Sequence, residues 1–269
     1  MARMQLTELW RFPVKSLRGG RFSTLDVGPR GFVHDREWML VDAEGRFLTQ
    51  RQQARMALVD SRLVEGQLRL EAPGMPPLAV SIADRGEPLE VQVWGDRCAA
   101  LAPDPAADAW LSRFLGLPCR LVRQPAAAVR PVDPSYARPA DQVGFADGFP
   151  FLLISQASLD DLNRRLDEPV PMLRFRPNLV VSGAESYEED RWRRIRIGEL
   201  SFRVAKPCSR CIVPTIDPAT AERAAEPLRT LMTYRRRDNK VYFGQNLLHD
   251  GSGRLAEGMA VEVLEWADD

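Results

Sequence analysis

Short segments of alternating apolar and polar residues recur through the first half of this chain, and glycine or proline turns separate them. The segments cover residues 38–48, 61–70, 78–82 and 89–94, after a mixed stretch at 6–14. A period of two puts alternate side chains on opposite faces of a β-strand. Glu65-Gly66, between two alternating runs, favours a hairpin. Many short strands joined by tight turns predict a β-barrel or a β-sandwich.

The second half of the chain predicts further strands, at residues 149–154, 179–181, 195–197, 200–204 and 259–264. Residues 105–115 have helical features instead, because Asp104 and Pro105 suit the start of a helix and Gly116 suits its end. Ser158 and Asp161 have the spacing of a capping box, and residues 219–234 are also expected to be helical. The expected fold class is mostly β with a few helices (α+β).

A proline-rich connector separates the two halves. Residues 125–139 contain four prolines and three consecutive alanines, with little periodicity. This composition favours a partly extended segment over a helix or a strand. We therefore predict one domain over residues 1–124, a linker over 125–145 and a second domain over 146–269.

The charge composition excludes some classes of partner. The chain has 37 Lys and Arg against 37 Asp and Glu, so no overall field attracts it to nucleic acid or to a membrane. A small anion would need a local cluster of cations, and arginine, the commoner base here, suits phosphate and carboxylate. The longest apolar run, near residues 149–154, is too short to span a membrane, and the first residues lack the apolar core of a signal peptide. We expect a cytoplasmic protein that binds neither nucleic acid nor membrane.

Two of the four cysteines lie three residues apart, in Lys206-Pro207-Cys208-Ser209-Arg210-Cys211. A structural zinc site would need two more nitrogen or sulfur ligands, whereas the other two cysteines and both histidines are isolated in the sequence. A redox dithiol normally begins a helix, and Pro214 makes this segment a loop. Two further interpretations are a pair of buried thiols without chemistry, and a single thiolate that binds a metal whose other ligands come from a cofactor. Spacing alone does not choose among the four.

Five segments, in order, resemble the MOSC family, and more closely its branch of mitochondrial amidoxime reducing components and their bacterial relatives. They are Phe12-Pro13-Val14-Lys15-Ser16, Asp35-Arg36, residues 151–163, residues 175–183, and Pro207-Cys208-Ser209-Arg210-Cys211 with Asp217-Pro218. The resemblance covers nearly the whole chain. It implies a β-rich MOSC N-terminal domain packed on a MOSC β-barrel domain, with a cofactor site between the two.

The resemblance also implies a molybdenum cofactor, a molybdopterin whose metal takes one cysteine thiolate from the protein. By position, that metal ligand and catalytic residue is Cys211, and Cys208 has no assigned role. The matching cofactor-binding positions are Lys15, Ser16, Arg36, Ser155, Arg176, Asn178, Ser209, Arg210 and Asn246. The cations among them suit the phosphate of molybdopterin, so a neutral chain can hold an anionic cofactor. Asp217 is expected to hold a turn and not to act in catalysis.

As an enzyme of this family, the chain would reduce small N-hydroxylated compounds such as hydroxylamines, amidoximes and N-hydroxylated bases. The electrons would come from a separate iron–sulfur or flavin protein, since the sequence lacks the cysteine set of a ferredoxin domain. Relatives have a tyrosine where this chain has Asn246, so the contact there and the substrate preference can differ. The alternative is a molybdenum cofactor carrier or a sulfur-transfer module that uses Cys208 and Cys211 without reductase activity.

Overall fold

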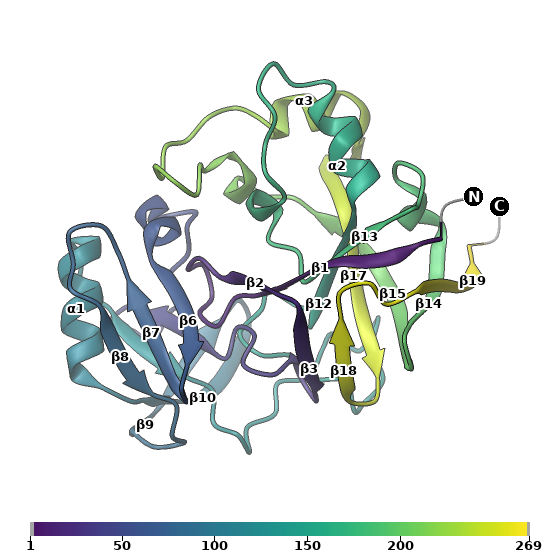
Figure 1. The fold of residues 1–269 in the computed structure, drawn as a ribbon. Helices are drawn as coiled ribbons and strands as arrows, with labels where there is room; N and C mark the ends of the chain where they lie inside the picture. The colour runs from purple at the N-terminus through teal and green to yellow at the C-terminus, as the bar shows by residue number, and fades with distance from the viewer. Residues whose placement is uncertain (1–2, 268–269) are drawn as a thin grey trace.

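The computed structural model describes residues 3–267 of the chain. Strands are the main element of these residues, which also form three α-helices and four short 3-10 helices, and this confirms the mostly β α+β class. Figure 1 shows two lobes, an N-terminal lobe with one helix and a C-terminal lobe with two helices at one end. Within the described residues, no helix has the length and apolar character needed to cross a membrane.

A nine-stranded sheet forms the C-terminal lobe and includes the first strand of the chain. In spatial order its strands are β19 (Val261–Trp266), β14 (Trp192–Ile197), β15 (Leu200–Ser209), β17 (Lys240–Asp250), β12 (Phe151–Ser155), β13 (Leu179–Ser182), β1 (Gln5–Arg11) and β2 (Gly20–Phe22), and β16 (Arg236–Arg237) pairs with β17. A bridge between Gln5 and Ala260 joins β1 to the start of β19 and closes the sheet into a barrel. Seven strands contribute to its core, with Leu6, Leu153, Val181, Trp192, Phe202, Leu247 and Val261.

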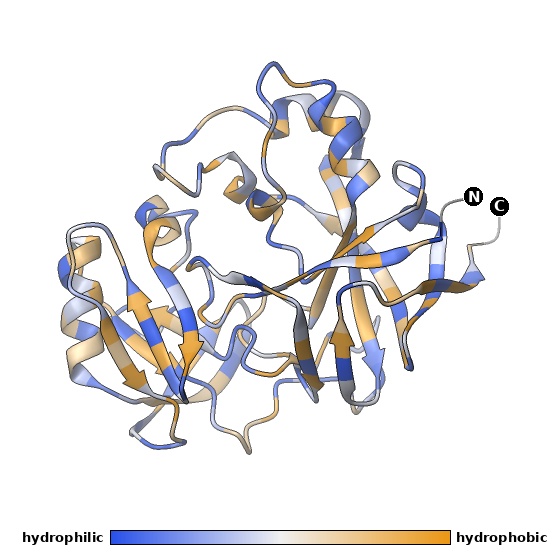
Figure 2. Cartoon of the chain, in the orientation of Figure 1, coloured by the Kyte–Doolittle hydropathy of each residue, from blue (hydrophilic) through white to orange (hydrophobic). Residues whose placement is uncertain are grey.

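Two further sheets form the N-terminal lobe. One has the order β5 (Trp38–Val41), β11 (Arg120–Arg123), β10 (Asp96–Ala102) and β9 (Glu87–Val93), and the other consists of β6 (Asp60–Val64), β7 (Gln67–Glu71) and β8 (Leu78–Ser81). Helix α1 (Pro105–Leu115) begins at Asp104, whose carboxylate accepts a hydrogen bond from Ala106 N (2.9 Å), and ends at Gly116. Figure 2 shows hydrophobic and hydrophilic residues alternating along these strands. The predicted hairpin at Glu65-Gly66 and both ends of the helix are confirmed.

The first and last segments of the chain share sheets. A three-stranded sheet pairs β3 (Thr24–Gly28) with both β4 (Gly31–Phe32) and β18 (Gly253–Ala256), so β3, like β1, pairs with a strand from the C-terminal half. The proline-rich connector also folds back on itself, because Val143 N donates a hydrogen bond to Arg130 O (3.0 Å). The proposed boundaries at 124 and 146 stay a prediction.

The region before helix α3 differs from the prediction. Helix α3 spans Leu228–Tyr234, whereas we expected a helix over 219–234. Ala221 has a left-handed backbone (φ 62°), and Asp217 accepts a hydrogen bond from Ala219 N (2.7 Å), so this region is a turn. The turn role expected for Asp217 agrees with this contact. The 3-10 helices are η1 (Ala54–Leu58), η2 (Met172–Phe175), η3 (Glu188–Arg191) and η4 (Val213–Thr215).

Two other local features differ from the sequence pattern. Helix α2 (Gln156–Asn163) has Ser155 as its N-cap, and Ser158 lies inside it, so the predicted capping box was wrong. Strand β17 was not predicted, because Gly244-Gln245-Asn246 interrupts its apolar alternation. A Cβ at Gly244 (φ +81°) would lie 2.8 Å from Leu153 O, so only glycine allows this close approach of β12.

Arg130 anchors the connector, and its contribution to stability can be measured. Its buried side chain donates hydrogen bonds to Gly144 O (2.9 Å), Ala146 O (2.6 Å) and the Asp96 carboxylate (2.8 Å). Arg130→Met leaves these acceptors without their donor, so we expect the free energy of unfolding to fall by about 2–4 kcal/mol. Urea-induced unfolding measures the loss.

Arg138→Met is the matched control in the same connector. Arg138 has a side chain that is 66% exposed, and it pairs with Asp250 at the surface (3.2 Å). Removing an exposed pair should cost less than about 1 kcal/mol. Equal losses in the two variants would contradict the anchoring role of Arg130.

Candidate functional site

A cavity of about 840 Å³ is lined by residues from both lobes. Among residues 3–267, its lining contains eight Lys or Arg side chains and one carboxylate, that of Asp147. The cations are Lys15, Arg36, Arg51, Arg176, Lys206, Arg210, Arg236 and Lys240. A cavity of this size suits a small molecule or a cofactor, and its charge favours an anionic one.

The structure brings nine of the ten predicted site residues to this cavity. They are Lys15, Ser16, Arg36, Arg176, Asn178, Ser209, Arg210, Cys211 and Asn246. Ser155 is the exception, since it is fully buried and its hydroxyl accepts a hydrogen bond from Ser158 N (3.1 Å) at the start of α2. The hydroxyl of Ser155 thus caps the N-terminus of α2 and does not line the cavity. The roles assigned to the other nine stay predictions.

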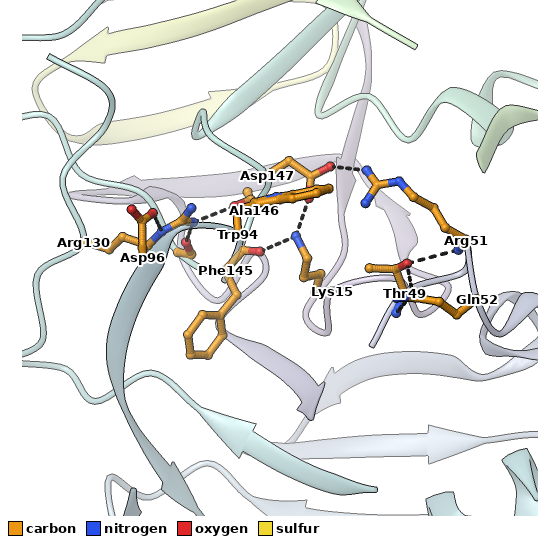
Figure 3. Close-up of polar contacts among 11 residues, drawn as sticks. Lys15, Thr49, Arg51, Gln52, Trp94, Asp96, Arg130, Phe145, Ala146 and Asp147 are labelled. Atoms are coloured by element: carbon orange, nitrogen blue, oxygen red, sulfur yellow. Dashed lines mark hydrogen bonds and ion pairs between the residues drawn. The ribbon is translucent and has the colours of Figure 1, made fainter. Parts of the chain in front are cut away.

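The buried Lys15 side chain joins the end of the first strand to the end of the connector. Its Nζ donates a hydrogen bond to Phe145 O (2.9 Å) and forms an ion pair with Asp147, as Figure 3 shows. Burial lowers the pKa of Lys15, and the attraction of Asp147 opposes that change. The ion pair therefore fixes a cation where residues of both lobes meet.

Asp147 has two further donors, Arg51 Nη2 (3.1 Å) and Trp94 Nε1 (3.4 Å) (Figure 3). Burial acts to raise the pKa of Asp147, but the charges of Lys15 and Arg51 outweigh burial and hold the pKa well below its usual range. Asp147 is therefore a carboxylate at neutral pH. Arg51 lines the same cavity as Cys211, the predicted metal ligand.

Arg36 and Arg176 both stack on the ring of Phe12, at 4.4 and 4.2 Å from its centroid. Arg36 pairs with Asp35 (2.5 Å) and donates a hydrogen bond to Arg176 O (3.0 Å). Arg176 Nη1 donates to Leu17 O (2.6 Å), whereas Nη2 is buried and has no partner in the described part of the chain. Burial and the charge of Arg36 lower the pKa of Arg176 to about 9, which leaves it cationic at neutral pH. A bound anion would supply the acceptor that Nη2 needs.

The two cysteines of the pair are half-buried and line the same cavity. Arg210 Nη1 lies 3.1 Å from Cys208 Sγ, and Arg210 Nη2 donates to Phe175 O (2.7 Å). Cys211 precedes the short turn η4 and begins no α-helix, in agreement with the loop expected from Pro214. Because both cysteines line the cavity, the interpretation of a pair of buried thiols without chemistry is disfavoured. No group of three His, Cys, Asp or Glu side chains within residues 3–267 is placed to hold a metal ion.

The cavity residues missed in the sequence include Arg51, Trp94, Asp147 and Lys206. Arg51 and Trp94 lie in turns of the N-terminal lobe and carry no motif. The sequence Asp147-Gly148 predicts a turn and nothing about a binding site. Lys206 directly precedes Pro207-Cys208, so its position beside the cysteine pair could have identified it.

The chain was compared with known proteins. It matches the MOSC N-terminal beta barrel domain over residues 3–118 and the MOSC domain over residues 140–262. It is 34% identical to mitochondrial amidoxime-reducing component 1 of Homo sapiens, over 96% of this chain and 82% of that protein. It is 35% identical to mitochondrial amidoxime reducing component 2 of Rattus norvegicus, over 88% and 74%. The molybdenum cofactor sulfurase of Oryza sativa subsp. japonica is 34% identical over 87% of this chain but only 31% of that protein.

The lowered pKa of Asp147 predicts how stability depends on pH. A carboxylate with a lower pKa in the folded state stabilises the fold above its unfolded pKa, about 3.9, and loses that contribution as the pH falls through the folded value. Asp147→Asn should therefore be less stable than the wild type at pH 5 and pH 7, and the difference should shrink below about pH 4. Urea unfolding of both proteins from pH 3 to pH 7 measures it. A difference that stays constant to the lowest pH would contradict an ionised Asp147.

Proposed function

This chain belongs to the MOSC-domain family, and from that membership and the cavity around Cys211 we propose that it is a molybdenum-cofactor-dependent reductase of N-hydroxylated compounds. The observation that carries the proposal is that a half-buried cysteine and eight cations line one cavity. The names of two relatives describe amidoxime reduction by those proteins, which supports the same reaction class here. The electron donor would be a separate iron–sulfur or flavin protein.

The cavity residues fit molybdopterin, which has an anionic phosphate, a polar pterin and two sulfurs for its metal. Arg176 would bind the phosphate through its unpartnered Nη2, and Lys15 and Arg36 would add positive charge. Cys211 would give the metal a soft thiolate ligand. Asn178 already donates from Nδ2 to Trp10 O (3.2 Å), so it would mainly hold the neighbouring backbone in place.

The chemistry of the reaction is divided between cofactor and protein. The bound cofactor would supply a metal that exchanges two electrons and accepts the oxygen of the N–OH group. The side chains would bind and orient the reactants. Asp147 is ionised, so it would position Lys15 and Arg51 and would not donate a proton. Arg51, a cation in the lining of the cavity that also contains Cys211, would stabilise negative charge that develops at the sulfur.

Cys211→Ala tests the assigned metal ligand. Without the thiolate, we expect the purified protein to lose its molybdenum and its reduction of benzamidoxime, while circular dichroism shows an unchanged fold. Cys208→Ala is the control in the same motif and should keep both. Expression in a molybdenum-replete host, followed by metal, pterin and activity assays, measures these outcomes. Normal turnover by Cys211→Ala would reject the assignment.

Arg176→Met tests the phosphate-binding role. Losing a charge-assisted hydrogen bond of about 1.5–3 kcal/mol should weaken pterin retention by roughly tenfold or more. Pterin content after extended dialysis measures the loss. Arg21→Met is the surface control, since Arg21 has a side chain that is 47% exposed and pairs with Glu8 outside the cavity. Equal pterin retention by the two variants would remove Arg176 from the site.

Sulfur transfer is the second candidate function. It is favoured by one observation, that Cys208 lines the same cavity and its sulfur lies 3.1 Å from Arg210 Nη1. A sulfur-transfer module would use both cysteines and would form a persulfide by taking sulfane sulfur from a donor persulfide, which leaves as a thiol. A cofactor carrier would bind the pterin, and neither would reduce a substrate. Equal loss of function in Cys208→Ala and Cys211→Ala would favour this alternative.

A further inference from the structure

The ring of Phe12 contacts two cations of the cavity lining without lining the cavity itself. Phe12 directly follows β1 and is fully buried. The guanidinium carbon of Arg36 lies 4.4 Å from the centroid of this ring, and that of Arg176 lies 4.2 Å from it. Both distances are within the range of cation–π attraction. One aromatic side chain thus connects an arginine from the first half of the chain to an arginine from the second half.

The two guanidinium groups repel each other, and carboxylates compensate them unequally. Arg36 pairs with Asp35 (2.5 Å), whose carboxylate also accepts a hydrogen bond from Phe12 N (2.7 Å). Arg176 donates to the carbonyl of Leu17 (2.6 Å), and burial and the charge of Arg36 lower the pKa of Arg176. The face of an aromatic ring carries partial negative charge, so the Phe12 ring attracts both guanidinium groups. This attraction opposes the repulsion that would separate them.

Arg36 and Arg176 also share an unusual backbone. Both are left-handed (φ 46° and 55°), which is uncommon for residues other than glycine. Such backbones persist where the surrounding structure holds them, and they cluster at functional sites. Arg36 N donates to Phe12 O (2.7 Å), and Arg36 O accepts from Phe145 N (2.7 Å). The connector approaches so closely that a Cβ at Gly144 would lie 2.8 Å from Arg36 O. The fold therefore sets the backbone of Arg36, and the ring of Phe12 directs its side chain.

We propose that Phe12 is a positioning residue for the cofactor phosphate, because its ring keeps Arg36 and Arg176 close enough for both to act on one phosphate group. This inference rests on the proposed function. The two guanidinium carbons lie no further apart than the sum of their distances to the ring centroid. Without the ring, the anion itself would have to bring two repelling cations together, and that cost would reduce its affinity.

A phosphate supplies what this pair of arginines lacks. Arg176 Nη2 is buried and has no partner within residues 3–267, so it needs an acceptor. The two arginines have one hydrogen-bonded carboxylate between them, that of Asp35, and the other cations of the lining add to the excess of positive charge. A phosphate group carries about −1.5 to −2 charge at neutral pH and three acceptor oxygens. It therefore provides both the acceptor and the compensating charge.

Three variants separate the aromatic character of the ring from its contribution to packing. Phe12→Leu keeps an apolar side chain and removes the aromatic face, whereas Phe12→Tyr keeps the ring. Phe32→Leu is the matched control, since Phe32 is also buried (2% exposed) and its ring packs on that of Phe151 in the barrel core. Both leucine variants lose buried contacts, so urea unfolding should show similar losses of stability for the two.

The measurement is phosphate binding by the protein without its cofactor. The full chain is purified from a host that makes no molybdopterin, and inorganic phosphate is titrated into it in a calorimeter. Removing a buried cation–π contact should weaken phosphate binding by Phe12→Leu about tenfold, whereas Phe12→Tyr and Phe32→Leu should keep the wild-type affinity. In protein loaded with cofactor, Phe12→Leu should also lose pterin about tenfold faster than Phe32→Leu during dialysis.

Equal phosphate affinity in Phe12→Leu and the wild type would overturn the positioning role. An equal loss in Phe32→Leu or in Phe12→Tyr would overturn it too, as would a wild type that binds no phosphate. The proposed function is tested separately, by the reduction of benzamidoxime by the molybdenum-containing wild type. If that protein reduces no N-hydroxylated compound, the reductase proposal fails, and the phosphate titration still decides the role of Phe12.

Discussion

The ion pair between Lys15 and Asp147 is the contact on which the cavity depends. Lys15 follows the first strand of the barrel, and Asp147 lies just after the connector, so the pair closes a long loop of chain. The Lys15 side chain is buried and that of Asp147 is 59% exposed, so loss of Asp147 would leave a buried cation without its counter-ion. Asp147 is shared with Arg51, which lines the same cavity as Cys211. One carboxylate thus sets the positions of two cations and, through them, the surroundings of the thiol.

A cluster of cations in one cavity is unfavourable unless each charge is compensated. Arg36 has Asp35, and Lys15 and Arg51 share Asp147. Arg176 has no hydrogen-bonded carboxylate among the described contacts, and its pKa is lowered by burial and by Arg36. Since the chain as a whole has equal numbers of basic and acidic residues, this imbalance is local. A local excess of buried positive charge is what an anionic ligand would neutralise.

The sequence predicted the features that depend on neighbouring residues and missed those that depend on distant ones. The Glu65-Gly66 hairpin and helix α1 follow from turn chemistry, capping and alternation, which act locally. Strand β17 was missed because Gly244 is required by the approach of another strand, which no local pattern indicates. Asp147, Arg51 and Trp94 lie in turns without a motif and meet only through tertiary contacts. Ser155 fits the resemblance in position, yet its hydroxyl is taken by a helix N-terminus.

The two lobes contribute residues to one cavity because the first strands of the chain pair with C-terminal strands, and not only because the connector joins the lobes. Strand β1 pairs with β13 inside the C-terminal barrel and leads within a few residues to Lys15 and Ser16. Cys211 follows β15 of the same barrel. Lys15, Ser16 and Cys211 therefore extend from strands of one closed sheet, whose strands cannot shift independently. Arg51 and Trp94, by contrast, come from the N-terminal lobe and reach the site through Asp147. A change in the relative position of the lobes would thus move Arg51 and Trp94 relative to Cys211.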